Sequence, residues 1–298
     1  MTTREFTAVG WPGWCDELAS RMGIIAHAEP IAGGDVNDAW RVELIDRRVV
    51  FVKSHAAPPP GMFAAEAEGL AWLAEGPLRV PRVLAVADGF LALEWLELGG
   101  RGVAGADGPG PQPRFEERLG RGLAQLHALG APSFGHARDN YLATLPQDNA
   151  PAPDAAAFWI DRRLRPTLAR LGDPALVDRL DRLRARPDRF GPPEPPARLH
   201  GDLWWGNIGC TSGARGGDPV VFDPAVYGGH REIDLAMLAL FGGVGDRLVA
   251  AYQEVWPLAA DWRSRLPLWQ LYPLAVHAVM FGGRYVPQLA RSLAALAA

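Results

Sequence analysis

Cysteine is nearly absent from this sequence of 298 residues, which holds only Cys15 and Cys210. Two cysteines cannot build the disulfide framework of a small secreted protein, and no Cys-x-x-Cys pair offers a metal site. Residues 1–9 contain Arg4 and Glu5 and no apolar stretch, so we expect no signal peptide. These absences predict a cytoplasmic protein.

The sequence also lacks an excess of positive charge and any long apolar run. Lys and Arg number 30 against 34 Asp and Glu, which gives a net charge of −4. Because nucleic-acid binding usually needs a basic surface, we exclude nucleic acid as a partner. No run approaches the ~18–20 apolar residues of a transmembrane helix, so we expect no membrane span.

The length suits two domains or one large two-lobed unit with a substantial core. Apolar residues make up 48% and charged residues 21%, as in an ordinary soluble protein. The chain also has 27 prolines and 34 glycines, many in clusters, which predicts long loops.

Three polar residues in the stretch 199–223 could carry phosphoryl-transfer chemistry: Asp202, Asn207 and Asp223. The spacing Asp-x-x-x-x-Asn is that of a kinase catalytic loop, in which Asp accepts the hydroxyl proton and Asn holds a metal. Asp223 follows the apolar run 220–222 and therefore ends a predicted strand. Since residues 212–218 read as a turn, the flanking strands should form a hairpin that brings Asn207 and Asp223 together.

A simpler interpretation is available for the same residues, because Asp and Asn in a glycine-containing turn often cap loose backbone groups. Lys53 favours the kinase hypothesis, since it ends the otherwise apolar strand 49–53. A lysine there either protects a sheet edge or binds nucleotide phosphates, and the second role needs a carboxylate partner. The predicted helix 62–73 supplies Glu66 beside its apolar face, whereas Glu68 points more to solvent.

The remaining nucleotide-binding candidates lie on either side of Lys53. Gly33 and Gly34 form a turn between two strands within residues 30–44; it could bind phosphate through its backbone or be a plain hairpin turn. Residues 80–87 and 90–96 read as two strands joined by an Asp-Gly turn. Residues 94–98 would be a hinge that pairs with adenine through the backbone of Glu94, Trp95 and Leu96.

Elsewhere the pattern is mainly helical. We expect helices within residues 11–29, from 115 to 127, from 155 to 171, from 174 to 184 and over most of the chain after 234. Loops are expected at 99–113 and 134–153, and a stiff proline-rich connector at 191–196. We expect His127 to be structural and Asp234 to cap a helix.

Longer motifs resemble the fructosamine kinase (ketosamine-3-kinase) family, whose members are related to aminoglycoside phosphotransferases. The resemblance runs over nearly the whole chain and is carried by residues 51–53, 134–141, 146–149, 199–207, 223–237 and 241–243. It implies an α+β, two-lobed, protein-kinase-like fold. The N-lobe, with an antiparallel sheet and a helix, would span residues 1–93, the hinge 94–98 and a larger, mainly helical C-lobe 99–298.

The resemblance also implies a function: ATP-dependent phosphorylation of the sugar 3-hydroxyl of a ketosamine, which leads to deglycation. Asp202 would be the catalytic base, Lys53 would hold the ATP phosphates with Glu66 orienting it, and Asn207 and Asp223 would bind Mg²⁺. The partner would be a small or protein-linked ketosamine, and the enzyme a monomer or homodimer.

The acceptor site is expected near Trp204, Trp205 and His230. Trp204 and Trp205 could stack on the sugar, although such a pair more often packs in a core. This chain departs from the family at Trp205, where Ser is frequent, and at residues 228–230, where Tyr-Gly-Asp is frequent. It also lacks the cysteine that some members carry in the glycine loop. A kinase of another small hydroxyl compound, such as an aminoglycoside, and a non-catalytic nucleotide-binding scaffold remain alternatives.

Overall fold

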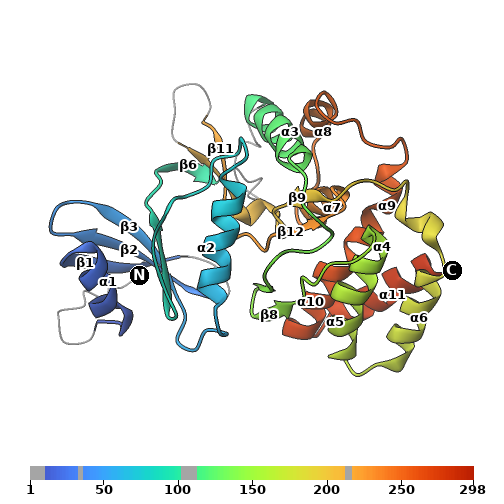
Figure 1. Ribbon diagram of the computed structural model, residues 1–298, viewed down its shortest axis with the longest axis horizontal. Helices are drawn as coiled ribbons and strands as arrows, with labels where there is room; N and C mark the ends of the chain where they lie inside the picture. Colours follow the sequence, from blue (N-terminus) through green and yellow to red (C-terminus); the bar gives the residue numbers. More distant parts are fainter. Residues whose placement is uncertain (1–10, 33–35, 102–112, 212–216) are drawn as a thin grey trace.

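The computed structural model describes residues 11–32, 36–101, 113–211 and 217–298. An antiparallel sheet with two helices forms an N-terminal lobe, and a larger, mainly helical C-terminal lobe lies beside it (Figure 1). The fold is therefore α+β. No helix within the described ranges is long and apolar enough to cross a membrane.

The N-terminal lobe begins with a helix that is shorter than the sequence pattern predicts. We expected a helix within residues 11–29, but Gly23 adopts φ 108° and ends it, and Ile25 already belongs to a strand. The elements of this lobe are α1 (Trp14–Met22), β1 (Ile25–Ile31), β2 (Asp38–Leu44), β3 (Val49–Ser54), α2 (Met62–Leu73), β4 (Val83–Ala87) and β5 (Phe90–Glu94).

The five strands form one antiparallel sheet in the order β1-β2-β3-β5-β4. Lys53 lies on the central strand, where it pairs with Ala39 of β2 and Leu91 of β5. A residue in the middle of a sheet cannot protect an edge, so the edge interpretation of Lys53 is wrong.

A second sheet positions Asn207, which directly precedes β10, and Asp223, which follows β11. It has the order β11-β10-β6, with β6 (Leu98–Arg101), β10 (Ile208–Thr211) and β11 (Pro219–Val221). The predicted hairpin of β10 and β11 is present, with Ile208 opposite Val221. We expected a loop over residues 99–113, but residues 99–101 belong to β6, which pairs with β10.

The other elements of the C-terminal lobe are mainly helices. They are α3 (Pro113–Ala128), β7 (Asn140–Leu142), β8 (Leu145–Gln147), α4 (Ala155–Ala157), a π-helix (Phe158–Leu164), α5 (Arg165–Ala169), α6 (Pro174–Arg184), a 3₁₀ turn (Pro187–Phe190), β9 (Ala197–Leu199), a 3₁₀ turn (Trp205–Asn207), β12 (Tyr227–Gly229), α7 (Glu232–Leu240), α8 (Asp246–Gln253), α9 (Trp262–Trp269), α10 (Leu271–Phe281) and α11 (Tyr285–Ala297). β7 and β8 form a small hairpin inside the expected loop 134–153.

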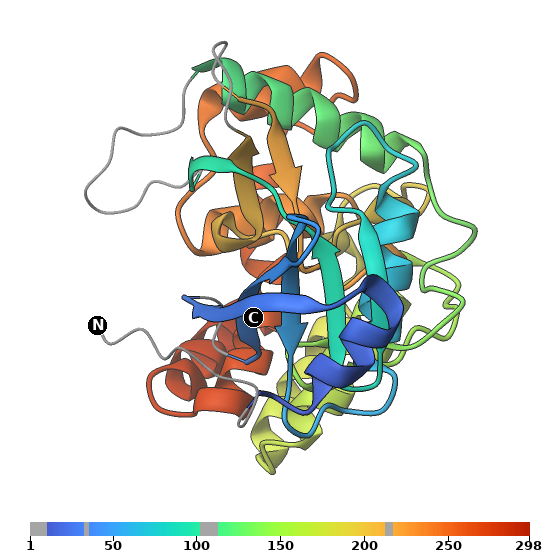
Figure 2. The same ribbon diagram turned by 90° about the vertical axis from the view of Figure 1, so that its left-hand side faces the viewer.

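One hydrophobic core is shared between the two lobes. It contains Phe63 and Leu70 of α2, Leu91 and Leu93 of β5, and buried side chains of α3, α7 and α8 such as Leu123. Figures 1 and 2 place α2 between the sheet and the C-terminal lobe. The helix that carries Glu66 is thus packed on both sides.

Candidate active site

Lys53 forms ion pairs with one carboxylate from each lobe. Its Nζ donates to both carboxylate oxygens of Glu66, at 2.8 and 2.9 Å, and to Oδ1 of Asp223 at 2.8 Å. Burial disfavours the ammonium charge, but the carboxylates of Asp223 and Glu66 outweigh it and raise the pKa of Lys53. The lysine therefore stays charged and links the sheet to the loop after β11.

Glu66 is the carboxylate that the sequence pattern selects, and the structure buries it beside Lys53. Its burial, opposed by Lys53 and reinforced by the charge of Asp223, raises the pKa of Glu66 to about 7. Glu68 is exposed and pairs instead with Arg138. One ammonium is thus shared by two carboxylates, which leaves the cluster with excess negative charge.

α2 is held against the segments that precede and follow the catalytic residues. A Cβ atom on Gly69 would lie 3.3 Å from side-chain atoms of Pro224 and Val226, just after Asp223, so α2 packs tightly against this segment. Arg198 of β9 donates to the carbonyl of Trp72 at 2.9 Å, and its guanidinium lies over the Trp72 ring. The helix that carries Glu66 is therefore packed against β9 and against the segment after Asp223.

Asp202 lies in the loop after β9, close to Asn207. The Nδ2 of Asn207 donates to the backbone oxygen of Asp202 at 2.9 Å and to its Oδ2 at 3.0 Å. Burial and the nearby charge of Asp223 raise the pKa of Asp202 well above its usual value. Gly201 has φ 81°, and a Cβ there would lie 2.1 Å from the carbonyl of Ala225, so the loop requires glycine at this position.

Asp234 has a role that sequence reasoning missed. We expected it to cap a helix, but it accepts hydrogen bonds from the backbone N–H groups of His200 at 2.8 Å and Gly201 at 3.0 Å. It also contacts His127 at 3.2 Å, and His127 is buried and structural as expected. Despite burial, hydrogen bonds from His127 and His200 hold the pKa of Asp234 below its usual value. This buried carboxylate fixes the backbone just before Asp202.

Asp223 lies beyond β11 in a conformation that few non-glycine residues adopt, with φ 57°. Phe222 donates its N–H to the carbonyl of Asn207 at 3.1 Å, and the Asn207 Nδ2 lies 3.4 Å from the Asp223 carbonyl. The structure therefore brings Lys53, Glu66, Asp202, Asn207 and Asp223 together.

The oxygen donors of this cluster fit a magnesium ion of the kind that a kinase uses. The Nδ2 of Asn207 faces the oxygens of Asp202 and Asp223, so its Oδ1 is the atom left for a metal. In the described part of the chain no group of three or more His, Cys, Asp or Glu side chains could hold a metal by itself. Mg²⁺ is commonly bound by one or two carboxylates together with substrate phosphates, which agrees with this sparse donor set.

The three expected acceptor residues do not share one environment. Trp204 is 39% exposed, whereas Trp205 is 5% exposed and its indole N–H donates to the carbonyl of Gly243 at 2.9 Å. His230 is 2% exposed and stacks on Trp269 with ring centroids 4.8 Å apart. Trp205 and His230 are therefore buried in the core, and of the three expected acceptor residues Trp204 is the one with an exposed side chain.

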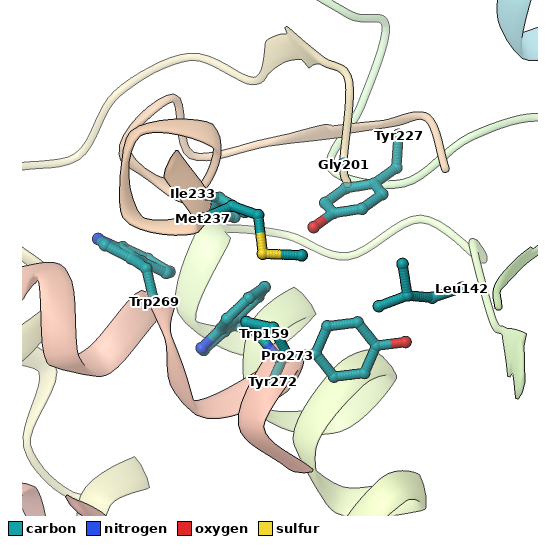
Figure 3. A pocket seen from close by; sticks show the side chains of 9 residues that line it. All are labelled: Leu142, Trp159, Gly201, Tyr227, Ile233, Met237, Trp269, Tyr272 and Pro273. Atoms are coloured by element: carbon teal, nitrogen blue, oxygen red, sulfur yellow. The ribbon is translucent and has the colours of Figure 1, made fainter. Parts of the chain in front are cut away.

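A small cavity under the catalytic loop is too small to hold the acceptor. It has a volume of about 10 Å³ and is lined by Gly201, Tyr227, Met237 and several aromatic side chains (Figure 3). The Tyr227 hydroxyl faces it and has no hydrogen-bond partner among the described residues. This space suits one water molecule.

Only some of the residues that we expect to bind the nucleotide lie within the described part of the chain. Gly33 and Gly34 lie outside the described residues. Glu94 ends β5, and its side chain pairs with Arg79 and Arg82. Trp95 donates to Glu97 at 2.8 Å, and Leu96 is half-buried in the connection to β6.

Comparisons with known proteins agree with this geometry. A family model described as "Fructosamine kinase" matches residues 14–298. A protein of Enterococcus faecium named "Probable ketoamine kinase" is 38% identical over 271 residues, which cover 87% of this chain and 91% of that protein. A protein of the same description from Thermus thermophilus is 38% identical over 282 residues, with coverage of 93% and 98%.

Solved structures show the same fold. A protein from Thermobifida fusca assigned as a fructosamine-3-kinase superposes with a TM-score of 0.83 at 38% identity, and the match covers 96% of this chain and 99% of that one. The gentamicin-bound structure of APH(2")-IIa superposes with a TM-score of 0.62 over 97% and 96% of the two chains. At 12% identity that second match shows the protein-kinase-like fold alone.

Proposed function

Because the chain belongs to the fructosamine kinase family and is therefore an ATP-dependent phosphotransferase acting on a hydroxyl group, we propose that its acceptor is a ketosamine. A ketosamine is an amine glycated by a sugar such as glucose or ribose, and the reacting group would be the sugar 3-hydroxyl. The 3-phosphate of such a product is unstable, so its loss would free the amine and repair the glycated molecule.

The family match supports the ketosamine acceptor, and the observation that supports the phosphotransfer chemistry best is the contact of one lysine with carboxylates from both lobes. Lys53 holds Glu66 and Asp223 at 2.8 Å, and Asn207 connects Asp223 to Asp202. A kinase needs this combination, because it must clamp phosphates, bind a metal and receive a hydroxyl proton within one small volume.

Asp202 is the proposed general base. Asn207 holds its Oδ2, which leaves Oδ1 to accept the acceptor proton. The raised pKa of Asp202, caused by burial and by Asp223, makes it a stronger base than an exposed aspartate. Asp234 acts indirectly, since it holds the backbone that positions Asp202.

Lys53 is proposed to bind the nucleotide phosphates while Glu66 keeps it in place. Asn207 Oδ1 and the carboxylate of Asp223 are the proposed metal ligands. A bound Mg²⁺ would neutralise charge on the transferred group. Gly33 and Gly34 are proposed to contact phosphates through their backbone, and the backbone of residues 94–98 to pair with adenine.

An acceptor screen with ATP consumption as readout tests the proposed substrate class. The panel contains fructosamines, ribulosamines, free sugars and aminoglycosides, and ³¹P NMR locates the new phosphate. We expect turnover of ketosamines with phosphate on the 3-hydroxyl. Turnover confined to aminoglycosides, or a phosphate on another hydroxyl of the sugar, would refute the proposal.

A further inference from the structure

A partly exposed strip of aromatic side chains leads away from the loop that holds Asp202. It consists of Trp204, Phe241 at the end of α7, His277 and Phe281 on α10, and Tyr285 at the start of α11. Neighbouring ring centroids lie 5.0–6.3 Å apart, from Trp204–Phe241 at one end to Phe281–Tyr285 at the other. We call these five residues the aromatic strip.

Three rings of the strip are exposed where a folded protein would normally bury them, and His277 and Tyr285 are half-buried. Trp204 is 39%, Phe241 36% and Phe281 53% exposed. Contiguous exposed apolar surface of this kind commonly marks a binding site. His277 is held in place, because its Nδ1 donates to the carbonyl of Pro273 at 2.7 Å.

The position of the strip says which part of a substrate can reach it. Trp204 is two residues from Asp202, and its N–H donates to the Asp202 carbonyl, so the strip begins beside the proposed general base. One sugar ring is about the size of one aromatic ring and covers only the Trp204 end. The amine nitrogen of a ketosamine is bonded to C1, two carbons from the C3 that carries the reacting hydroxyl, so its substituent is within reach of the strip.

Resting on the proposed function, we propose that Phe241, His277, Phe281 and Tyr285 form a subsite for an apolar substituent on the ketosamine nitrogen. Aromatic faces stack on apolar and aromatic groups. Arg284 lies over the Tyr285 ring, 5.2 Å from its centroid, so the far end carries positive charge and disfavours a cationic substituent. The enzyme then selects its substrates by the amine as well as by the sugar.

Three fructosamines that share the sugar test this subsite: the N-methyl, N-(2-phenylethyl) and N-(2-aminoethyl) compounds. We expect kcat/KM to be about tenfold higher for the phenylethyl than for the methyl compound, mainly through KM, as one aromatic pair allows. The aminoethyl compound should not exceed the methyl compound. In the variant Phe281→Ala the preference for phenylethyl should fall towards unity.

A matched control replaces an exposed apolar residue elsewhere. Ile45 is 61% exposed at the end of β2, and Ile45→Ala should keep the phenylethyl preference intact. Equal kcat/KM for the methyl and phenylethyl compounds, or an unchanged preference in Phe281→Ala, would overturn the subsite while leaving the proposed function standing. Absence of turnover with all three fructosamines would overturn the proposed function and the subsite together.

Discussion

Glu66→Gln tests how much the orientation of Lys53 by Glu66 contributes to ATP binding and turnover. Glu66 is buried and offers Lys53 two oxygens, at 2.8 and 2.9 Å, together with a negative charge. The glutamine keeps the shape and one neutral acceptor. A hydrogen bond between charged groups is worth about 1.5–3 kcal/mol, so we expect kcat/KM for ATP to fall by about 10–100-fold.

The same change should alter the metal dependence. With Glu66 neutral, the remaining carboxylate partner of Lys53 in the described structure is Asp223, 2.8 Å away. Lys53 then competes more strongly with Mg²⁺ for Asp223, so half-maximal rate should need more free Mg²⁺. Steady-state kinetics with ATP and Mg²⁺ varied independently measure both effects.

A neighbouring residue provides the control. Glu68 lies on the same helix but is exposed, and its ion pair with Arg138 is of the surface kind that contributes at most about 1 kcal/mol. Glu68→Gln should therefore behave like the wild type. The reasoning fails if Glu66→Gln keeps the wild-type kcat/KM for ATP, or if Glu68→Gln loses as much.

The pH dependence follows from the same carboxylate, whose pKa is raised to about 7. Above that pH Glu66 is ionised and holds Lys53; below it Glu66 is protonated and holds Lys53 less well. KM for ATP should thus rise as the pH falls from 8 to 6. Because Glu66→Gln lacks the titrating group, its KM should change less, and this comparison removes the titration of ATP itself.

Three further variants test other parts of the site. Asp202→Asn should lower kcat by about 10²–10⁴-fold and preserve ADP binding. Because the pKa of Asp202 is raised in the folded protein, its negative charge destabilises the fold above that pKa. This variant should therefore also melt at a higher temperature than the wild type at pH 8. Asp223→Ala should weaken binding of Mg·ADP in calorimetry, and unchanged affinity would exclude the ligand role. Gly69→Val should push α2 away from Pro224 and Val226, at about 1–3 kcal/mol, and raise KM for ATP; an unaltered KM would show that Glu66 does not depend on this contact.

Sequence alone could predict the parts of the site that follow from short-range pattern. Lys53 lies near the end of an apolar strand, Glu66 flanks the apolar face of one helix, and a short hairpin connects Asn207 to Asp223. In each case the place of the side chain on its strand, helix or hairpin depends on residues that are close to it in the sequence. The strands and helices around them therefore lie close to where the pattern puts them.

The sequence could not predict the environment of residues that are surrounded by distant parts of the chain. Trp205 and His230 have the composition of a sugar-binding site, but α7 and α9 bury them. Asp234 reads as a helix cap because it precedes an apolar run, whereas its partners are amides more than 30 residues earlier. Burying a carboxylate costs free energy unless it has hydrogen-bond partners. An Asp next to an apolar helix is therefore the one sequence signal that indicates partners elsewhere in the chain.

Lys53 and the shared core together explain why this site can be complete before a nucleotide binds. α2 is packed into one hydrophobic core with α3 and α7 and is fixed at Gly69 and Arg198, so Glu66 has no need of a separate activating event to reach Lys53. Under the proposed roles the contact between Lys53 and Asp223 is the one that must change, because Lys53 would bind phosphate and Asp223 would bind the metal. Since one ammonium is shared by the buried carboxylate of Glu66 and the partly exposed carboxylate of Asp223, a cation at Asp223 would relieve repulsion and free Lys53 in the same step. Metal and nucleotide binding should therefore be coupled through this single lysine rather than through movement of a helix.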